Sequence, residues 1–152
     1  MSRSETAIFT NMCMIYDDDD ERVLVQDRLD PNWPGITFPG GHVNKFESFS
    51  DSVIREVYEE TGLTIETPIL CGIKQFHTKN DERYVVLLYK TNKFSGKLKS
   101  SKEGNVFWIK KQDIYNYELA PDFEKMLQVF EDDNFSELYY YRYGETQHSL
   151  LL

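Results

Sequence analysis

The sequence predicts an α/β fold, in which helices cover both faces of a mixed β-sheet. Short apolar segments typical of strands alternate along the chain with two segments that have helical apolar periodicity. The chain has 152 residues, of which 40% are hydrophobic and 14% aromatic. That length supports one hydrophobic core and leaves no room for a second, so we expect residues 1–152 to form a single domain.

The first two strands are predicted to form a hairpin. Residues 7–16 are mostly apolar, and residues 22–28, which end at Arg28, form the second apolar segment. The acidic run Asp17–Asp20 between them suits an exposed turn, because aspartate tolerates turn geometry and solvent. A metal site in this run is the alternative, but the run lacks the spaced ligands and the turn glycine of a calcium loop.

A proline-rich loop at residues 29–35 and a short extended piece at 36–38 lead to Pro39-Gly40-Gly41. The first helix is then predicted to begin at Ser48, whose hydroxyl can cap it, and to end before Gly62, a typical left-handed terminal residue. Its predicted buried face combines residues that recur at helical spacing: Ser50, Val53, Ile54, Val57 and Thr61.

The second half of the chain alternates strands with a loop and helices. We expect Pro121 to take the first turn of the main helix in this half, and Phe123, Met126, Leu127 and Phe130 to share its buried face. The predicted elements are strands at 64–77 and 82–91 joined by a turn at 79–81, a loop at 92–105, a strand at 106–109, a brief helix at 110–117, a helix at 121–131 and a final strand at 137–143.

Charge and composition exclude several classes of protein. The net charge is −9 and the lysines are scattered, so phosphate-mediated binding to a long nucleic acid is not expected. No apolar run approaches the length of a membrane span, and the N-terminus lacks the pattern of a signal peptide. Cys13 and Cys71 both lie in apolar runs, which favours a reduced, cytoplasmic protein over the alternative of a disulfide.

The first helix carries more acidic charge than its stability explains. Glu56, Glu59 and Glu60 are three and four residues apart, so their like charges repel on one helical face. Arg55 can reach Glu59 at i,i+4 and offsets part of this repulsion. A divalent cation would offset the rest, because Mg²⁺ prefers oxygen ligands and bridges carboxylates to phosphates. An ordinary solvated acidic helix is the alternative on composition alone.

The spacing of the whole segment favours the metal site. The defined positions are Gly41, five residues, Glu47, seven residues, Arg55-Glu56, an aliphatic residue, one residue, Glu59-Glu60, one residue, Gly62 and an aliphatic residue. This pattern matches the Nudix box at every defined position, and a chance match in a chain of this length has a probability on the order of 10⁻⁷. The chain therefore resembles the Nudix hydrolases, and the strands on either side of the box also suit that family.

The resemblance implies an α/β/α sandwich and hydrolysis of a nucleoside diphosphate that is linked to another group. It implies that Mg²⁺ or Mn²⁺ is held by the carboxylates of Glu56, Glu59 and Glu60 and by the Gly40 carbonyl. Arg55 would orient the glutamates, and Glu47 would support the box or a second metal.

The base that accepts the proton of the attacking water differs among Nudix subfamilies. Glu103 resembles the loop glutamate of MutT-type enzymes, and Glu59 and Glu60 are the alternatives. By the same resemblance, the substrate-binding residues are Gly41, Phe38, Phe76, Arg28 and Asp122. A core role for Phe38 and Phe76 is the alternative, since phenylalanine is usually buried. Asp122 stands where a MutT-type enzyme has an asparagine that reads oxidised guanine, and this departure puts specificity for 8-oxo-dGTP in doubt.

The expected function is metal-dependent hydrolysis of a nucleoside triphosphate, including an oxidised, 8-oxo-dGTP-like one, to the monophosphate and pyrophosphate. The alternatives are hydrolysis of a dinucleotide, a nucleotide sugar or a capped RNA 5′ end, and a catalytically silent nucleotide sensor. The complete set of box acids argues against the sensor. The aromatic tail at residues 139–141 is expected either to complete the sheet or to pack across a homodimer interface.

Overall fold

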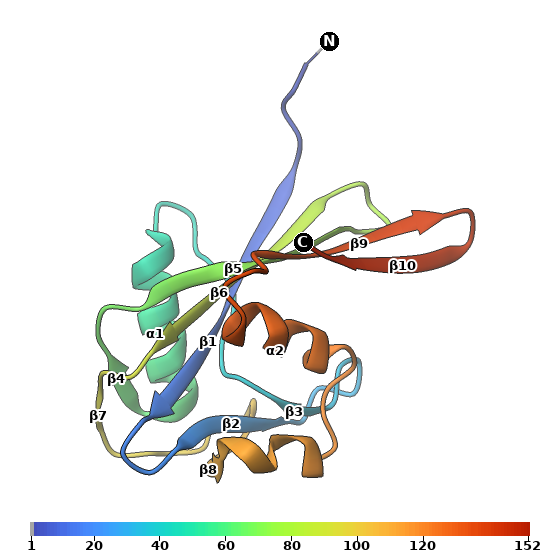
Figure 1. The fold of residues 1–152 in the computed structure, drawn as a ribbon. Helices are drawn as coiled ribbons and strands as arrows, with labels where there is room; N and C mark the ends of the chain where they lie inside the picture. The colour runs from blue at the N-terminus through green and yellow to red at the C-terminus, as the bar shows by residue number, and fades with distance from the viewer. Residues whose placement is uncertain (1) are drawn as a thin grey trace.

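A curled, mixed β-sheet forms the centre of the molecule in the computed structural model, which describes residues 2–152 (Figure 1). Within these residues the sheet has eight strands in the order β10-β9-β5-β6-β1-β2-β3, with β8 paired to β2. The strands of this sheet are β1 (Ala7–Asp17), β2 (Arg22–Arg28), β3 (Gly35–Thr37), β5 (Ile69–His77), β6 (Arg83–Thr91), β8 (Gly104–Lys110), β9 (Glu137–Tyr143) and β10 (Thr146–Leu151). A separate small sheet pairs β4 (Leu63–Ile65) with β7 (Phe94–Gly96).

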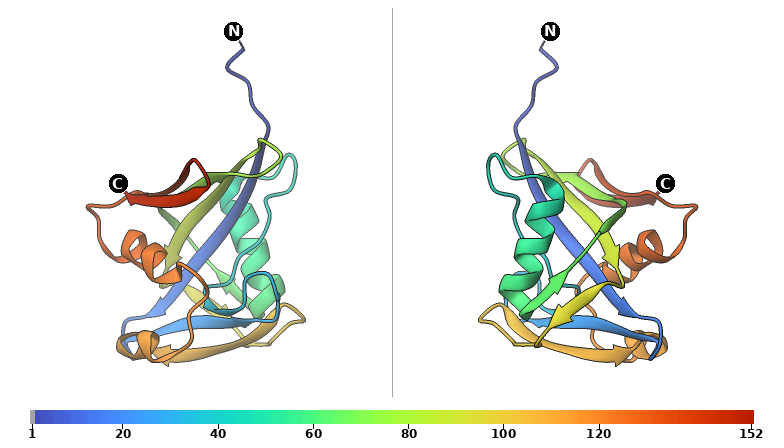
Figure 2. Two further views of the ribbon diagram at one scale, coloured as in Figure 1. Left: turned by 90° about the vertical axis from the view of Figure 1, so that its right-hand side faces the viewer. Right: turned by 90° about the vertical axis from the view of Figure 1, so that its left-hand side faces the viewer.

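The long strand β1 connects the two parts of the sheet. Most of β1 pairs in parallel with β6, from Ala7 opposite Arg83 to Ile15 opposite Thr91. Its last residues turn into the antiparallel pairing with β2. The views in Figure 2 show β2 and β8 crossing the base of the molecule at a steep angle to β1 and β6. The acidic run forms the hairpin connection, as predicted: Asp17 ends β1, and residues 18–21 make the turn. Arg22 forms an ion pair with Asp17 at 3.0 Å.

One helix covers each face of the sheet. Helix α1 (Phe49–Thr61) places Val53 and Val57 against one face, where alternate residues of β1 and β6 such as Cys13 and Leu87 are buried. Helix α2 (Phe123–Glu131) packs on the opposite face, against the other alternate residues of the same two strands. Successive side chains of β1 and β6 point to opposite faces of the sheet, so these two strands contribute to a hydrophobic core on each face. This confirms the predicted α/β class with a mixed sheet between helices.

Helix α1 has the predicted bounds, because its caps are encoded locally. The Ser48 hydroxyl accepts a hydrogen bond from the Asp51 backbone N–H at 3.0 Å, and Gly62 adopts a left-handed conformation with φ of 77°. The predicted buried face is partly wrong: Ser50 is exposed, whereas Ser52 and Glu60 are buried. The buried glutamate indicates, as its acidic sequence does, that this helix contributes to more than packing.

Other predicted elements differ from the structure. The strand predicted at 64–77 is two strands, β4 and β5, which pair with different partners and are separated by residues 66–68. The loop predicted at 92–105 contains β7. Helix α2 starts at Phe123 and excludes Pro121, because Asp122 takes a left-handed conformation with φ of 65°. The short 3₁₀ helix η1 (Lys111–Asn116) matches the brief helix predicted there.

The tail completes the sheet and continues beyond the predicted final strand. Strand β9 lies between β5 and β10, and β10 was not predicted. Tyr139 and Tyr141 stack on each other, and Tyr141 stacks on His148 of β10. Cys13 is buried and Cys71 half-buried, and both are free cysteines. None of the helices formed by residues 2–152 has the length and apolar character that a membrane crossing requires.

Candidate active site

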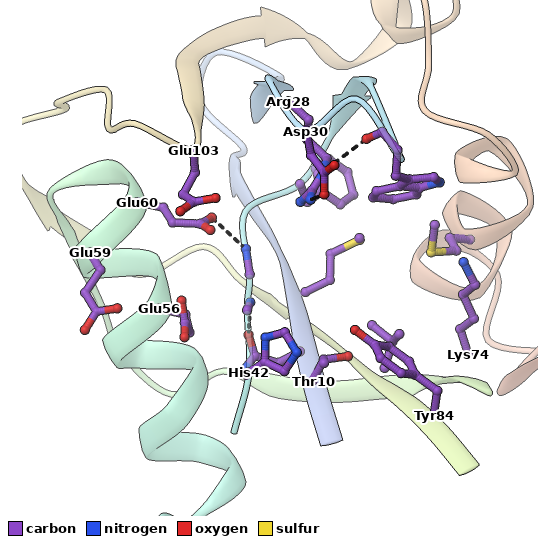
Figure 3. Close-up of a pocket in the computed structure, with 18 of the residues that line it drawn as sticks. Thr10, Arg28, Asp30, His42, Glu56, Glu59, Glu60, Lys74, Tyr84 and Glu103 are labelled. Atoms are coloured by element: carbon purple, nitrogen blue, oxygen red, sulfur yellow. Dashed lines mark hydrogen bonds and ion pairs between the residues drawn. The ribbon is translucent and has the colours of Figure 1, made fainter. Parts of the chain in front are cut away.

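A cavity of about 770 Å³ opens between the Gly40-Gly41 loop, helix α1 and the start of helix α2. Its two sides differ in chemistry, as Figure 3 shows. One side is acidic and carries Glu56, Glu59 and Glu60 from α1 and Glu103 from the loop before β8. The other side is largely aromatic and aliphatic: it includes Met12, Trp33, Phe38, Phe76, Tyr84, Val86 and Met126, together with Lys74. The cavity thus suits a ligand with one strongly charged end and one flat, apolar end.

Arg55 does not line the cavity but fixes the acidic side chains by hydrogen bonds. Its Nε and one terminal nitrogen donate to both carboxylate oxygens of Glu47, at 2.7 and 2.9 Å. Its other terminal nitrogen donates to Glu56 at 2.9 Å and to Glu59 at 3.2 Å. Hydrogen bonds from Arg55 and from the Asn44 backbone lower the pKa of Glu47 to about 2. Arg55 therefore neutralises part of the acidic charge and fixes where the glutamates lie.

The carboxylate of Glu47 is bound to Arg55. Both of its oxygens accept hydrogen bonds from Arg55, and Glu47 does not line the cavity. Its place outside the cavity lining favours the predicted supporting role over a role as metal ligand.

Glu60 is buried at the acidic side, with 6% of its surface exposed. Its Oε2 accepts hydrogen bonds from the Gly40 backbone N–H at 3.0 Å and from Gln26 Nε2 at 3.2 Å. Burial, followed by the charges of Glu56 and Glu103, raises the pKa of Glu60 to about 7 despite these hydrogen bonds. Burial is therefore the main reason that Glu60 holds its proton more tightly, and its acidic neighbours add to the effect.

The two glycines of the loop make room for different neighbours. A Cβ on Gly40 would lie 2.1 Å from the Asn11 backbone oxygen, so only glycine allows the loop to lie on β1. A Cβ on Gly41 would lie 2.3 Å from the Glu56 carboxyl carbon. Gly41 therefore leaves the space that the Glu56 carboxylate occupies at the cavity wall.

A divalent cation fits the chemistry of this side. Carboxylate oxygens are the ligands that Mg²⁺ prefers, and a cation here would also relieve the repulsion that Glu56 and Glu103 exert on Glu60. Gln26 Oε1 is also buried without a hydrogen-bond partner beside Glu60. As the side chains stand, no three acidic, histidine or cysteine groups among residues 2–152 are placed to share one ion. Glu56 and Glu59 face Arg55 in this arrangement, so binding requires their side chains to turn toward the ion.

Glu103 joins the cluster from outside the helix. Its side chain lies beside Glu60 in the cavity (Figure 3), and its charge contributes to the raised pKa of Glu60. Leu29 N–H donates to the Glu103 carbonyl at 3.3 Å, which attaches this loop to the end of β2. The structure thus brings together all four acids that the sequence nominated for chemistry: Glu56, Glu59, Glu60 and Glu103.

The aromatic side contains most of the residues predicted to bind substrate. Phe38 packs edge-on against Phe123 and Phe130 with centroids 4.9 and 5.1 Å apart, so it is a core residue whose ring also closes the cavity. Phe76 stacks on Tyr84 at 5.0 Å. For both residues the structure combines the core role and the pocket role that the sequence left as alternatives.

Arg28 lines the cavity, whereas Asp122 does not. Arg28 Nε donates to the Trp33 carbonyl at 3.1 Å, and its guanidinium lies 5.2 Å from the centre of the Trp33 ring. The carboxylate of Asp122 instead accepts a hydrogen bond from the Tyr140 hydroxyl at 2.9 Å. The direct contact with a purine edge proposed for Asp122 therefore finds no support in the cavity lining.

Several residues of the site were not predicted from the sequence. Asn11 joins three parts of it: its Nδ2 donates to Ser52, its Oδ1 accepts from Gly41 N–H, and its N–H donates to the Gly41 carbonyl. A lone amide inside an otherwise apolar strand was the signal that could have identified it. Trp33, Lys74 and Tyr84 carry no local signal, because their role depends on which distant segments meet at the cavity.

Comparison with known proteins identifies the family. Residues 9–130 match the NUDIX domain. An uncharacterised Nudix hydrolase of Bacillus subtilis, YvcI, is 33% identical over 114 residues, which are 72% of this chain and 70% of that protein. An ADP-ribose pyrophosphatase of Methanocaldococcus jannaschii is 28% identical over 121 residues, covering 76% and 69% of the two chains.

A solved structure agrees in fold. The MutT protein of Bacillus halodurans superimposes with a TM-score of 0.72 and 24% identity, over 93% of this chain and 97% of that one. The matched region includes the acidic helix, the glycine loop and the strands that carry the aromatic side of the cavity. The chain belongs to the Nudix hydrolases, pyrophosphohydrolases that act on nucleoside diphosphates linked to another group.

Proposed function

We propose that the protein is a divalent-metal-dependent pyrophosphohydrolase that converts a nucleoside triphosphate to the monophosphate and pyrophosphate. Oxidised, 8-oxo-dGTP-like nucleotides are included among its substrates. One observation carries the proposal: four glutamates line one side of a cavity whose other side is aromatic. A nucleotide has the matching polarity, with a phosphate chain at one end and a flat base at the other.

Glu56, Glu59, Glu60 and the Gly40 carbonyl are the proposed ligands of Mg²⁺ or Mn²⁺. When bound, the cation neutralises diphosphate oxygens and makes a water more acidic. Arg55 holds Glu56 and Glu59 at the cavity wall, and Glu47 in turn fixes the guanidinium of Arg55. Gly40 N–H and Gln26 keep the Glu60 carboxylate in place. The contacts to Glu60 reduce the reorganisation that the site needs, whereas Glu56 and Glu59 must still turn from Arg55 toward the ion.

Glu103 is the proposed proton acceptor for the attacking water. It lines the cavity beside Glu60, yet it lies on a loop and outside the Arg55 network. Glu59 is the less suited alternative, because its carboxylate already accepts a hydrogen bond from Arg55. The aromatic side, with Phe76 stacked on Tyr84, offers a flat surface for the base.

A nucleotide panel with Mg²⁺ tests this function. The native protein is expected to release pyrophosphate from at least one nucleoside triphosphate. Glu59→Gln and Glu103→Gln are each expected to lower the rate by at least roughly 10²-fold. Glu145→Gln, at an exposed position in the turn between β9 and β10, removes the same charge away from the cavity and is expected to leave the rate unchanged.

The possible outcomes separate the alternatives. Absence of turnover for every nucleotide would favour a binding sensor. Full activity in Glu59→Gln would remove it from the ligand set, and full activity in Glu103→Gln would return the base role to Glu59 or Glu60. The panel includes ADP-ribose, because one relative is an ADP-ribose pyrophosphatase. If ADP-ribose is hydrolysed to AMP and ribose phosphate and no nucleoside triphosphate is hydrolysed, the proposed substrate class changes from a nucleoside triphosphate to a sugar-linked diphosphate.

A further inference from the structure

Lys74 is a cation on the apolar side of the cavity that the acidic site does not use. It lies on β5, two residues before Phe76, so the two side chains share one face of the strand. Its Nζ lies 5.4 Å from the ring centre of Trp33, 5.9 Å from that of Phe76 and 5.1 Å from that of Tyr140. Three segments distant in sequence thus supply an aromatic cage for one ammonium group.

The ammonium has no fixed hydrogen-bond acceptor. Among residues 2–152 it forms neither a hydrogen bond nor an ion pair, and its contacts are with ring faces. Asp122 is the acid whose charge acts on Lys74, but its carboxylate accepts from the Tyr140 hydroxyl at 2.9 Å and pairs with Lys125 at 3.5 Å. Burial lowers the pKa of Lys74, and the charge of Asp122 offsets only part of that effect. The ammonium donors therefore remain available to a ligand that enters the cavity.

Lys74 lies on the side of the cavity opposite the acidic residues. Figure 3 shows Lys74 across the cavity from Glu56 and Glu59, with Thr10 and Tyr84 between them. A nucleotide whose phosphates lie at the acidic side places its base, and not its phosphates, near the aromatic cage. Lysine has donors and no acceptor, so it bonds to acceptor atoms on a base edge and gains nothing from an amino group.

We propose that Lys74 selects the base of the substrate, favouring purines with an oxygen at C6 over purines with an amino group there. The O6 and N7 atoms of guanine or hypoxanthine offer two acceptors to the ammonium, whereas adenine presents its N6 amino group beside N7. This inference rests on the proposed function, because it assumes that a nucleotide enters with its phosphates at the acidic side. It assigns the choice of base to a residue outside the Nudix box.

Binding of monophosphates tests the inference without requiring turnover. IMP and AMP share the ribose phosphate, but IMP has an oxygen at C6 of the base where AMP has an amino group. Calorimetric titration with each nucleotide therefore compares the two base edges directly. The native protein is expected to bind IMP roughly tenfold more tightly than AMP. Lys74→Met keeps much of the aliphatic stem and is expected to weaken IMP binding to the level of AMP, with AMP little changed. Lys74→Arg, which retains donors, is expected to keep the preference.

Lys79→Met is the matched control, since Lys79 is exposed in the turn after β5 and should leave both affinities unchanged. Equal binding of IMP and AMP by the native protein, preference for AMP, or binding of neither would overturn the inference. So would Lys74→Met weakening both ligands by one factor, which would indicate a packing or phosphate contact. If Lys74→Met does not fold, the native ratio still decides, because an IMP-to-AMP ratio near one overturns the inference.

The binding experiment on Lys74 and the nucleotide hydrolysis panel can fail independently of each other. A Lys74-dependent preference for IMP without hydrolysis of any nucleotide would reject the catalytic proposal and keep this one. Pyrophosphate release without that preference would keep the catalytic proposal and reject the role of Lys74.

Discussion

Gly40 and Gly41 are neighbours, yet a methyl group at each would meet a different obstacle. At Gly41 it would meet the Glu56 carboxylate, which is the mobile end of a side chain, at 2.3 Å. At Gly40 it would meet the Asn11 carbonyl oxygen and the Met12 Cα, which are backbone atoms, at 2.1 and 2.7 Å. The two substitutions should therefore separate the chemistry of the site from the stability of the fold.

Gly41→Ala is expected to displace Glu56 and lower the hydrolysis rate by roughly 10- to 100-fold. The free energy of unfolding should change by less than about 1 kcal/mol, because a side chain can move aside. Gly40→Ala is expected to lower the free energy of unfolding by about 3 kcal/mol, because the backbone atoms that the new methyl group meets cannot move aside. Thermal unfolding and steady-state rates of both variants check this. A Gly41→Ala protein with the native rate would show that Glu56 has no role at this wall.

At the residue scale, the sequence predicts the acidic residues of the site well and the aromatic cage around Lys74 poorly. Glu56, Glu59 and Glu60 follow from helical spacing, which places residues three and four apart on one side. Lys74 and Trp33 do not, since nothing within either segment indicates that they meet. Asp122 was nominated by its position in the chain, and its side chain is instead bound to Tyr140.

At the element scale, the helix α1 is attached to the preceding loop by the pairing of Arg55 with Glu47. One terminal nitrogen of Arg55 also donates to the His42 carbonyl at 2.9 Å, so one side chain links the glycine loop, residue 47 and the helix. This attachment depends on the ionised form of Glu47. The pKa of Glu47 is about 2 in the folded protein against a usual value of 4.5.

We expect the Glu47 contact to stabilise the protein at neutral pH and to lose this effect in acid. A carboxyl whose pKa is depressed by folding contributes stability above its unfolded pKa, and that contribution falls as pH decreases from about 4.5 toward 2. Urea unfolding of native protein and Glu47→Gln between pH 7 and 2 measures it. The difference in unfolding free energy should be largest near pH 7 and shrink toward pH 2. Parallel curves would show that the pair contributes nothing pH-dependent.

The elements that were predicted correctly have local signals, and those that were missed depend on distant partners. Helix α1 has its cap at Ser48 and its end at Gly62 within its own sequence. Strand β10 is polar at its start and exposed, and its hydrogen-bonding partner is β9. The division between β4 and β5 arises because β4 pairs with β7 and β5 with β6. Pairing of this kind is decided by tertiary contacts that single-segment patterns do not contain.

At the scale of the whole molecule, the cavity joins a locally encoded acidic helix to an aromatic surface assembled from the loop before β3, strands β5 and β6, and helix α2. The sequence predicts the reaction class because the box is contiguous. It does not predict the shape of the substrate site, because that site forms only when the curled sheet brings these segments together (Figure 1).

The central claim is that the acidic side of this cavity binds the divalent cation that the hydrolysis needs. Titration with Mn²⁺, with the free ion followed by its paramagnetic resonance signal, measures binding without a substrate. The native protein is expected to remove Mn²⁺ from solution, and Glu56→Gln and Glu60→Gln should each weaken binding at least roughly tenfold. The exposed Glu145→Gln should bind as the native protein does. Unchanged Mn²⁺ affinity in both cavity variants would contradict the claim.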